Sequence, residues 1–323
     1  MKTIAIKFMP FWQGWNDYDN FIYNILKTRY EVIISDKPDY LICPISSTNQ
    51  VHFRDCIKIL YTAENLCPDF NMFDYAIGFD WLDYGDRYFR FPCAYLDKEK
   101  FNLLENKHTF EIFERNKFCN FIYSNNAADP IRTFFYQELS KYKKIDSLGK
   151  YLNNMGGKLC EDKLKTQSQY KFTIAFENSA HPGYTTEKLI DAFAAGTVPI
   201  YWGDPEVTKV FNPKAFINIS GYQDIPEAIE KIKFLDSNDI AYNNMLQEPA
   251  LLSEEYNLSN MYERLEAFLF NIFDQDKESA YRHNRVFWGK YYLDKQEAKQ
   301  NVYDKYLKLI NIKAKICPWK KRK

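Results

Sequence analysis

The sequence lacks paired cysteines, an excess of charge of either sign and any long apolar run. Its seven cysteines are widely scattered, without a CxxC pair or a Cys/His cluster at metal spacing, which argues against a disulfide framework and a structural zinc site. Lys plus Arg and Asp plus Glu both total 43, so no strong overall field attracts this protein to nucleic acid. No stretch reaches the roughly 18 apolar residues that a membrane-spanning helix needs.

Secretion features are also missing from the start of the chain. The first residues, MKTIAIKFMPFWQGW, have neither a long apolar core nor a small-residue cleavage site, and they are typical of a first strand and loop. Unpaired thiols suit a reducing compartment. We therefore expect a cytoplasmic protein.

What the chain does contain is a twofold alternation of short apolar runs and helical segments. The first third has the runs TIAIKFM, EVIISD, DYLIC, IKILY and FDYAIGF, with a helical segment at DYDNFIYNILKTRY. The second alternation has the helix PIRTFFYQELSKY and the runs FCNFIYSN, YKFTIAF, TVPIYW and AFINI. Continuous apolar runs favour strands buried on both faces of a parallel sheet. The predicted class is α/β, with two Rossmann-like halves.

A length of 323 residues also favours two domains over one. We expect an N-terminal domain at 1–110, a second domain at 111–295 and a basic tail at 296–323, with the seam near 105–115. The tail from Lys299 to Lys323 carries nine basic residues and one acidic residue. Two interpretations stay open: a solvated helix with a frayed basic end, which is common, and peripheral contact with an anionic membrane surface.

One segment concentrates polar side chains between two apolar runs: FENSAHPGYTTEKLIDAFAAGTVPIYWGDPEV. We expect a strand from Tyr170 to Glu177, a helix from Thr185 to Ala195 and a returning strand from Val198 to Trp202. The loop after the first strand then lies at the carboxyl end of the sheet, where open α/β sheets bind ligands.

The start of that predicted helix suits an anion. With Thr185 as the N-cap, Glu187 and Lys188 fall in the first turn, beside free backbone N–H groups and the positive end of the helix dipole. A diphosphate would be stabilised there, with Lys188 as its charge partner. Taken singly, Glu187 could complement the dipole, Lys188 could be solvated and Asn178 could be a turn residue. Their grouping at the end of a buried strand favours a site.

Two further residues follow the same logic. Glu64 comes just after the run Ile57 to Tyr61, at the carboxyl end of a strand of the first half, where a carboxylate can serve as a general base. Asp129 and Pro130 are predicted as N-cap and first residue of a helix that places Arg132 in its first turn. An arginine there suits phosphate oxygens, with a surface ion pair as the alternative.

The combination of these segments resembles the α-1,3/4-fucosyltransferase family. The resemblance runs from about Tyr61 to Phe211 and is carried by YTAEN with FDYAIGFD and DRYFRFP, by FCNFIYSNNAADPIRTFFYQEL, and by the long segment quoted above. It implies a GT-B architecture, with two facing Rossmann-like domains and the active site in the cleft between them. It also implies GDP-β-L-fucose as donor and inversion to an α-fucoside in one displacement.

Site residues follow from the resemblance position by position. Glu64 falls on the general base, and Arg132 and Lys188 fall on ligands of the diphosphate. Asn178, Tyr184 and Glu187 fall on donor-binding positions, and Glu187 is also a catalytic candidate. Its role is left open between ribose hydroxyls, fucose hydroxyls and the charge of the transition state. The implied acceptor is an oligosaccharide of the LacNAc or lactose type, fucosylated at O3 or O4 of GlcNAc or at O3 of glucose.

No DxD pair stands where it would chelate a metal, and a lysine, an arginine and a helix dipole can take the charge of the leaving diphosphate. We therefore expect no required cofactor, with divalent ions as stimulants at most. Trp12 and Trp15, just after the first strand, are candidates for stacking on the acceptor sugar, and core packing is the equal alternative.

Two competing functions remain at this point. One is an inverting GT-B transferase with another nucleotide-sugar donor. The other is a non-catalytic glycan-binding protein that keeps the fold, and the presence of Glu64 argues against it.

Overall fold

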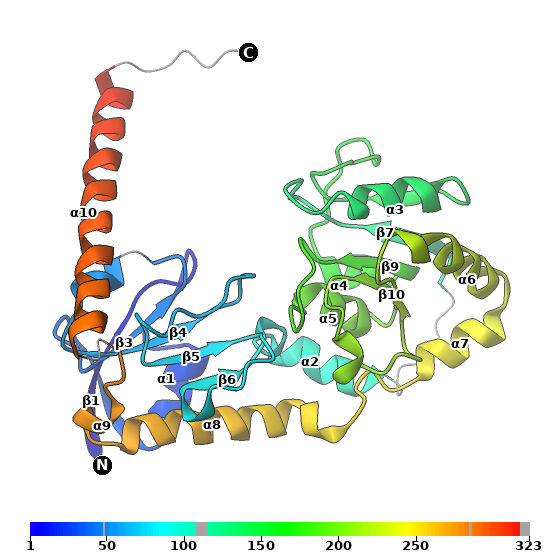
Figure 1. Cartoon of the computed structure of the whole chain (residues 1–323). Helices are drawn as coiled ribbons and strands as arrows, with labels where there is room; N and C mark the ends of the chain where they lie inside the picture. The colour runs from blue at the N-terminus through cyan, green and yellow to red at the C-terminus, as the bar shows by residue number, and fades with distance from the viewer. Residues whose placement is uncertain (48, 108–114, 284–285, 317–323) are drawn as a thin grey trace. The chain divides into compact units, whose positions relative to one another are not determined.

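The computed structural model describes residues 1–47, 49–107, 115–283 and 286–316. The chain forms two compact units (Figure 1). Unit 1 comprises Met1–Gly78, Asp83–Phe89 and Glu266–Lys323, and unit 2 comprises Phe79–Leu82 and Arg90–Leu265. Each unit is built on its own sheet with helices around it, so the predicted α/β class with two Rossmann-like halves is confirmed.

Unit 1 has a six-stranded sheet in the order β2-β1-β3-β4-β5-β6. Its strands are β1 (Lys2–Phe8), β2 (Tyr30–Ile34), β3 (Tyr40–Pro44), β4 (Ile57–Tyr61), β5 (Tyr75–Gly78) and β6 (Tyr88–Arg90). Its helices are α1 (Phe21–Leu26), α9 (Lys277–Ala280) and α10 (Val286–Ile316). Every residue of β3, β4 and β5 is buried, as expected for parallel strands covered on both faces.

Unit 2 has a five-stranded sheet in the order β11-β10-β9-β7-β8, with parallel pairing throughout. Its strands are β7 (Lys117–Phe121), β8 (Ile145–Ser147), β9 (Tyr170–Phe176), β10 (Val198–Trp202) and β11 (Ile217–Asn218). Its helices are α2 (Lys98–Glu105), α3 (Ile131–Ser140), α4 (Lys163–Gln167), α5 (Glu187–Ala194), α6 (Ile225–Ser237) and α7 (Asp239–Gln247). Helix α8 (Leu258–Asp274) runs from unit 2 into unit 1.

The core of unit 2 shows why its strands are so apolar. Phe172, Ile174 and Phe176 of β9 pack in one cluster with Val198 and Ile200 of β10, and all five side chains are buried. A central strand has helices on both faces, so it has no position for a solvated side chain. The polar residues of this region are therefore pushed to the loops at the strand ends.

The division of the chain differs from the boundaries expected from sequence. Residues from Glu266 onward belong with the first sheet rather than with the second, and Tyr40 of β3 contacts Phe273 of α8 with ring centroids 4.3 Å apart. The chain thus returns to its first unit after completing the second. No local pattern encodes such a return, because it depends on pairings more than 200 residues apart. Part of the predicted seam at 105–115 lies outside the described residues.

The predicted basic tail at 296–323 is continuous with α10 as far as the structure describes it. Arg54 of unit 1 forms ion pairs with Asp294, at 2.5 Å, and with Glu297 of this helix. The later turns expose Val302, Tyr306 and Ile310, which share one side of the helix by their spacing. Within the described ranges, no helix combines the length and apolar character needed to cross a bilayer.

Candidate active site

The first residue after β9 is a fully buried carboxylate. Glu177 has 0% exposure and accepts hydrogen bonds from the backbone N–H of Thr186, at 2.8 Å, and from the Thr186 hydroxyl, at 2.7 Å. Its own N–H donates to the carbonyl of Trp202 on β10. Glu177 therefore fixes the start of α5 against the ends of the two central strands.

Lys188, in the first turn of α5, completes this arrangement. Its Nζ lies 3.1 Å from Glu177 Oε2, 3.1 Å from Glu187 Oε1 and 2.9 Å from Thr186 Oγ1. Burial alone would lower the pKa of Lys188, but the carboxylates of Glu177 and Glu187 together raise it above its ordinary value. Burial opposes ionisation of Glu187 as well, yet Lys188 and Lys163 hold its pKa below the usual range. Lys188 is thus a fixed cation at a helix N-terminus.

The sequence analysis did not assign Glu177 to the site. Burial raises its pKa, and the neighbouring Lys188 opposes that effect. The sequence does contain a signal for it. Glu177 directly follows a strand of seven residues, six of which are buried, and a buried carboxylate needs a partner. A lysine, Lys188, stands eleven residues later.

The predicted N-cap is off by one residue. Helix α5 begins at Glu187, so Thr186 is the N-cap, and it makes no side-chain capping bond. The reason is that both threonine hydroxyls are used elsewhere. Thr185 Oγ1 donates to Asp204 Oδ2 at 3.0 Å, while Thr186 Oγ1 donates to Glu177. Glu187 and Lys188 still fall in the first turn, as predicted.

Asp204 is the second buried carboxylate that holds this loop. Besides the Thr185 hydroxyl, it accepts hydrogen bonds from the backbone N–H of Gly183, at 2.8 Å, and of Glu206, at 2.8 Å. Burial raises its pKa, which these hydrogen bonds partly oppose. Asp204 thereby ties the α5 end of the loop between β9 and α5 to the segment after β10.

Gly203 makes room for this packing. Its φ is +151°, and a Cβ added there would lie 2.4 Å from the Cγ of Glu177. Such a distance is far below van der Waals contact, so only glycine fits beside the buried glutamate at this position.

Arg132 lies inside unit 2 rather than on its surface, with 1% exposure. Its Nη2 donates to Asn178 Oδ1, at 2.7 Å, and to the carbonyl of Phe176, at 3.1 Å, while the guanidinium lies 4.1 Å from the centroid of the Tyr123 ring. The alternative of a surface ion pair is therefore wrong. Among the described residues, Nε and Nη1 of Arg132 have no hydrogen-bond partner. A buried guanidinium with two unused donors is typical of an anion site.

Helix α3 starts one residue later than predicted. Pro130 takes the N-cap position instead of Asp129, whose Oδ1 accepts a hydrogen bond from Ile131 N at 3.0 Å. Arg132 nevertheless lies in the first turn.

Tyr184 is also buried, and its ring contacts that of Phe79, with centroids 5.0 Å apart.

The residues predicted to bind the donor thus gather on unit 2. Asn178 contacts Arg132, and Lys188 contacts Glu187, around the loop that leaves β9. The arrangement offers a fixed ammonium, unused guanidinium donors and the N-terminus of a helix. These are the groups that bind phosphate oxygens in proteins.

Glu64 lies on unit 1, in the loop that follows β4, and its side chain is exposed. Its backbone is held by Thr62, because the N–H of Glu64 donates to Thr62 Oγ1 at 3.2 Å and the same hydroxyl lies 3.1 Å from the Glu64 carbonyl. The carboxylate is free to reach solvent, as a general base that takes a proton from a bound hydroxyl must be.

Trp12 and Trp15 take different places in unit 1. Trp15 packs against Phe11, with centroids 4.5 Å apart, and its Nε1 donates to Asp17. Trp12 touches Trp15 edge-on at 4.8 Å but is 51% exposed. Phe11 in turn contacts Tyr61, the last residue of β4, at 5.6 Å. Trp15 is thus half-buried in the aromatic cluster beside β4, whereas Trp12 presents its ring to solvent there. The predicted stacking of either ring on an acceptor sugar remains a prediction.

Comparisons with known proteins agree with this picture. The model of the alpha-(1,3)-fucosyltransferase FucT N-terminal domain matches residues 6–97, and that of glycosyltransferase family 10 (fucosyltransferase) C-term matches residues 112–262. The chain is 33% identical over 312 residues to the alpha-(1,3)-fucosyltransferase FucT of Helicobacter pylori, with 82% of this chain aligned. It spans 65% of the length of that relative.

Solved structures are similar over most of the chain. A crystal structure of an alpha1,3-fucosyltransferase superposes with a TM-score of 0.75 at 29% identity, covering 88% of this chain and 93% of the other. A crystal structure of alpha1,3-fucosyltransferase with GDP-fucose gives a TM-score of 0.71 at 29% identity, covering 85% and 92%. Because matches in sequence and structure extend over both halves, the chain belongs to the α-1,3-fucosyltransferase family, glycosyltransferase family 10.

Proposed function

We propose that this protein transfers L-fucose from GDP-β-L-fucose to a hydroxyl of an oligosaccharide and inverts the anomeric carbon. The observation that carries the proposal is the fixed cation of unit 2: Lys188 held between Glu177 and Glu187 at the N-terminus of α5. A diphosphate leaving group needs positive charge that is in place before the bond breaks. The relative solved with GDP-fucose supports the identity of the donor.

The reaction divides between donor-side and acceptor-side groups. The acceptor oxygen forms its bond to C1 of fucose while the bond from C1 to the β-phosphate oxygen breaks, and GDP leaves with the electron pair. Lys188 and the unused donors of Arg132 stabilise the charge that develops on the diphosphate. Asn178 orients Arg132 through the 2.7 Å hydrogen bond, and Tyr184 and Glu187 bind the donor.

Glu64 takes the proton of the acceptor hydroxyl as the new bond forms. The acceptor is a LacNAc or lactose type of oligosaccharide, attacked through O3, or O4, of GlcNAc or through O3 of glucose. Trp12 stacks on a sugar face of this acceptor, since its ring is half exposed in the cluster beside β4.

In this proposal, Lys188 and Arg132 stabilise the negative charge that develops on the leaving diphosphate. Transfer therefore does not require a metal ion. Rates measured in EDTA test it: they should stay within a few-fold of the rates with added Mg²⁺ or Mn²⁺. Loss of more than 95% of activity in EDTA, restored by either ion, would contradict this part.

The decisive experiment is a donor and acceptor panel. The protein is incubated with GDP-fucose, GDP-mannose or a UDP-sugar, together with lactose or LacNAc, and the product linkage is read by NMR. An α-1,3- or α-1,4-fucoside formed only from GDP-fucose is the expected result. Turnover with another nucleotide sugar but not with GDP-fucose would favour the other transferase. Glycan binding without GDP release from any donor would favour a binding protein.

The contact of the basic tail with membranes remains a separate proposal. It is supported by the exposed Val302, Tyr306 and Ile310 on α10 and by the lysines between them. Co-sedimentation with vesicles containing 30% phosphatidylserine, lost after removal of residues 296–323, is the test. Equal sedimentation of the shortened protein would contradict it.

A further inference from the structure

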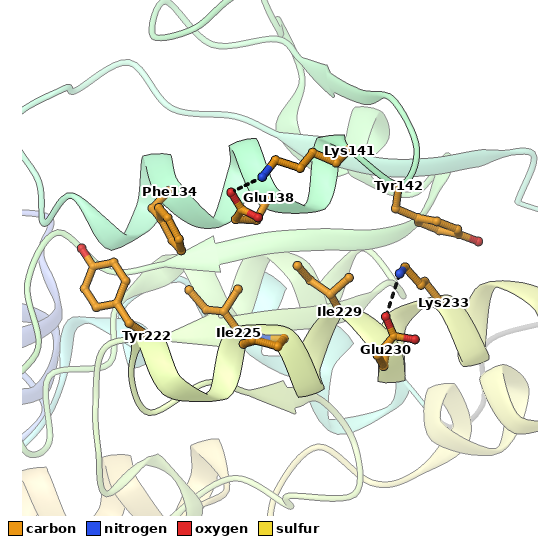
Figure 2. A pocket seen from close by; sticks show the side chains of 10 residues that line it. Phe134, Glu138, Lys141, Tyr142, Tyr222, Ile225, Ile229, Glu230 and Lys233 are labelled. Carbon is orange, nitrogen blue, oxygen red and sulfur yellow. Dashed lines mark hydrogen bonds and ion pairs between the residues drawn. The ribbon is translucent and has the colours of Figure 1, made fainter.

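A groove lies between α3 and α6 of unit 2, and none of the proposed site residues lines it (Figure 2). Its volume is 580 Å³, within the range of about 300 to 1,000 Å³ that is typical of sites for small organic ligands. Figure 2 shows Phe134 and Glu138 of α3 on one wall, facing Ile225 and Ile229 of α6 on the other.

Helix α3 packs in the core of unit 2 with one face and lines the groove with another. Ile131, Phe135 and Leu139 of α3 lie in the core of unit 2. Phe134, Glu138 and Lys141 recur at spacings of four and three residues, so they share a neighbouring face of the helix. They are not needed for that core. On the α6 wall, Ile225 belongs to that core and Ile229 packs against it, so only the α3 wall of the groove could vary without loss of the fold.

Exposed aromatic rings mark the two ends of the groove. At one end, Phe134 and Tyr222 touch with centroids 5.3 Å apart, yet they remain 41% and 49% exposed. At the other end, Tyr142 is held by a hydrogen bond from its hydroxyl to Asp236 at 3.0 Å, and it too is exposed. Ordered rings that stay in water are suited to stacking on a flat ligand.

The charges of the groove cancel within each wall. Glu138 pairs with Lys141 at 2.6 Å on α3, and Glu230 pairs with Lys233 at 2.7 Å on α6. A polyanion such as a nucleic acid needs a net positive groove, which these pairs do not offer. An apolar peptide or lipid chain would have to bury four charges, which is costly.

Neutral saccharides fit both features. The C–H face of a pyranose ring packs on an aromatic ring, and its hydroxyls donate to carboxylates and accept from ammonium groups. We propose that the groove between α3 and α6 binds a neutral oligosaccharide outside the reaction centre, such as the non-reacting part of a long acceptor chain. This inference rests on the proposed function only in its choice of a glycan as the ligand.

Binding can be observed without donor and without turnover. The probe is a hexasaccharide of three LacNAc units, titrated into protein labelled with ¹³C at the isoleucine δ1 methyl groups. Ile225 and Ile229 report from the groove, and their signals are assigned with the variants I225V and I229V. We expect both methyl signals to shift and to saturate with the hexasaccharide.

The variants F134A and Y222A each remove one stacking ring and should weaken binding at these signals roughly 3- to 12-fold. F234A is the matched control, since Phe234 is an exposed ring of α6 outside the groove lining, and it should leave the titration unchanged. Thermal unfolding of all three variants confirms that the fold is kept.

Several outcomes would overturn the assignment. They are a titration without shifts, an equal loss in F234A, or tighter binding of a sulfated oligosaccharide of the same length. Shifts of both methyl signals by GDP alone, competing with the hexasaccharide, would place the groove in the donor site instead. Fucose transfer to the disaccharide LacNAc is measured separately, so failure of the groove and failure of the proposed function are distinguishable.

Discussion

Two glutamates that both follow a buried strand are held in opposite ways. Glu64 follows β4 of unit 1 with an exposed side chain, and only its backbone is fixed, by Thr62. Glu177 follows β9 of unit 2, has no exposed surface, and its carboxylate is held by Thr186 and Lys188. The same residue type in the loop after a buried strand can thus serve two physical purposes.

The difference matches the roles that we propose for the two carboxylates. A general base must exchange a proton with a substrate, so its carboxylate has to remain accessible. A residue that positions a cation must not exchange protons or move, and burial with three donor groups, two from Thr186 and one from Lys188, achieves this. We infer that Glu64 acts by reacting and Glu177 by holding Lys188 in place.

The largest effect is expected from Glu64→Gln, which keeps the size of the side chain and removes its basicity. We expect kcat for fucose transfer to fall roughly 10²- to 10⁴-fold, the usual contribution of general base catalysis. GDP affinity, measured by calorimetric titration, should be unchanged because the residues proposed to bind the donor lie on unit 2. Near wild-type turnover would contradict the role of Glu64 as general base.

Lys188→Ala removes the fixed cation itself. A charge-assisted contact contributes about 1.5 to 3 kcal/mol, so GDP binding should weaken roughly 10- to 150-fold. Lys143→Ala is the matched control on the same unit, because Lys143 pairs with Asp236 at 3.0 Å and Asp236 keeps Lys171 as a second partner. If both variants lost the same affinity, general charge rather than the position of Lys188 would be responsible.

Glu177→Gln tests the holding role directly. The amide keeps the shape but removes the charge that faces Lys188, and its N–H₂ group meets other donors. We expect a loss of about 1 to 3 kcal/mol in the free energy of unfolding, measured in urea, together with weaker GDP binding. Glu206→Gln, which alters an exposed pair with Lys209, should leave both quantities unchanged. A fully stable Glu177→Gln protein with normal GDP affinity would refute the assignment.

The smallest effect is expected for the stability of Glu64→Gln. An exposed side chain with few fixed contacts changes the free energy of unfolding by no more than about 0.5 kcal/mol. Urea unfolding of this variant beside Glu177→Gln therefore sharpens the contrast between the two glutamates. A loss above 1 kcal/mol would mean that Glu64 also has a structural role.

Apolar runs predicted the sheets well because strands covered on both faces leave a continuous signal. The runs YKFTIAF and TVPIYW became β9 and β10 almost residue for residue. Helix N-caps were predicted one residue early at Thr185 and Asp129. The Thr185 hydroxyl bonds to Asp204 instead, whereas Asp129 still accepts a hydrogen bond from Ile131, the first residue of α3. The burial of Arg132 and its contact with Asn178 join residues 46 apart, and no local pattern contains that distance. The roles of Arg132 and the other predicted site residues remain predictions.

The close approach of Gly203 to Glu177 has a consequence for how this protein can change. A Cβ at position 203 would lie 2.4 Å from the Cγ of Glu177 and 2.6 Å from its Cβ, so even alanine at position 177 would leave the second clash in place. The φ of +151° also disfavours any other residue at 203. Variation at position 177 alone is therefore not expected to release position 203 from glycine.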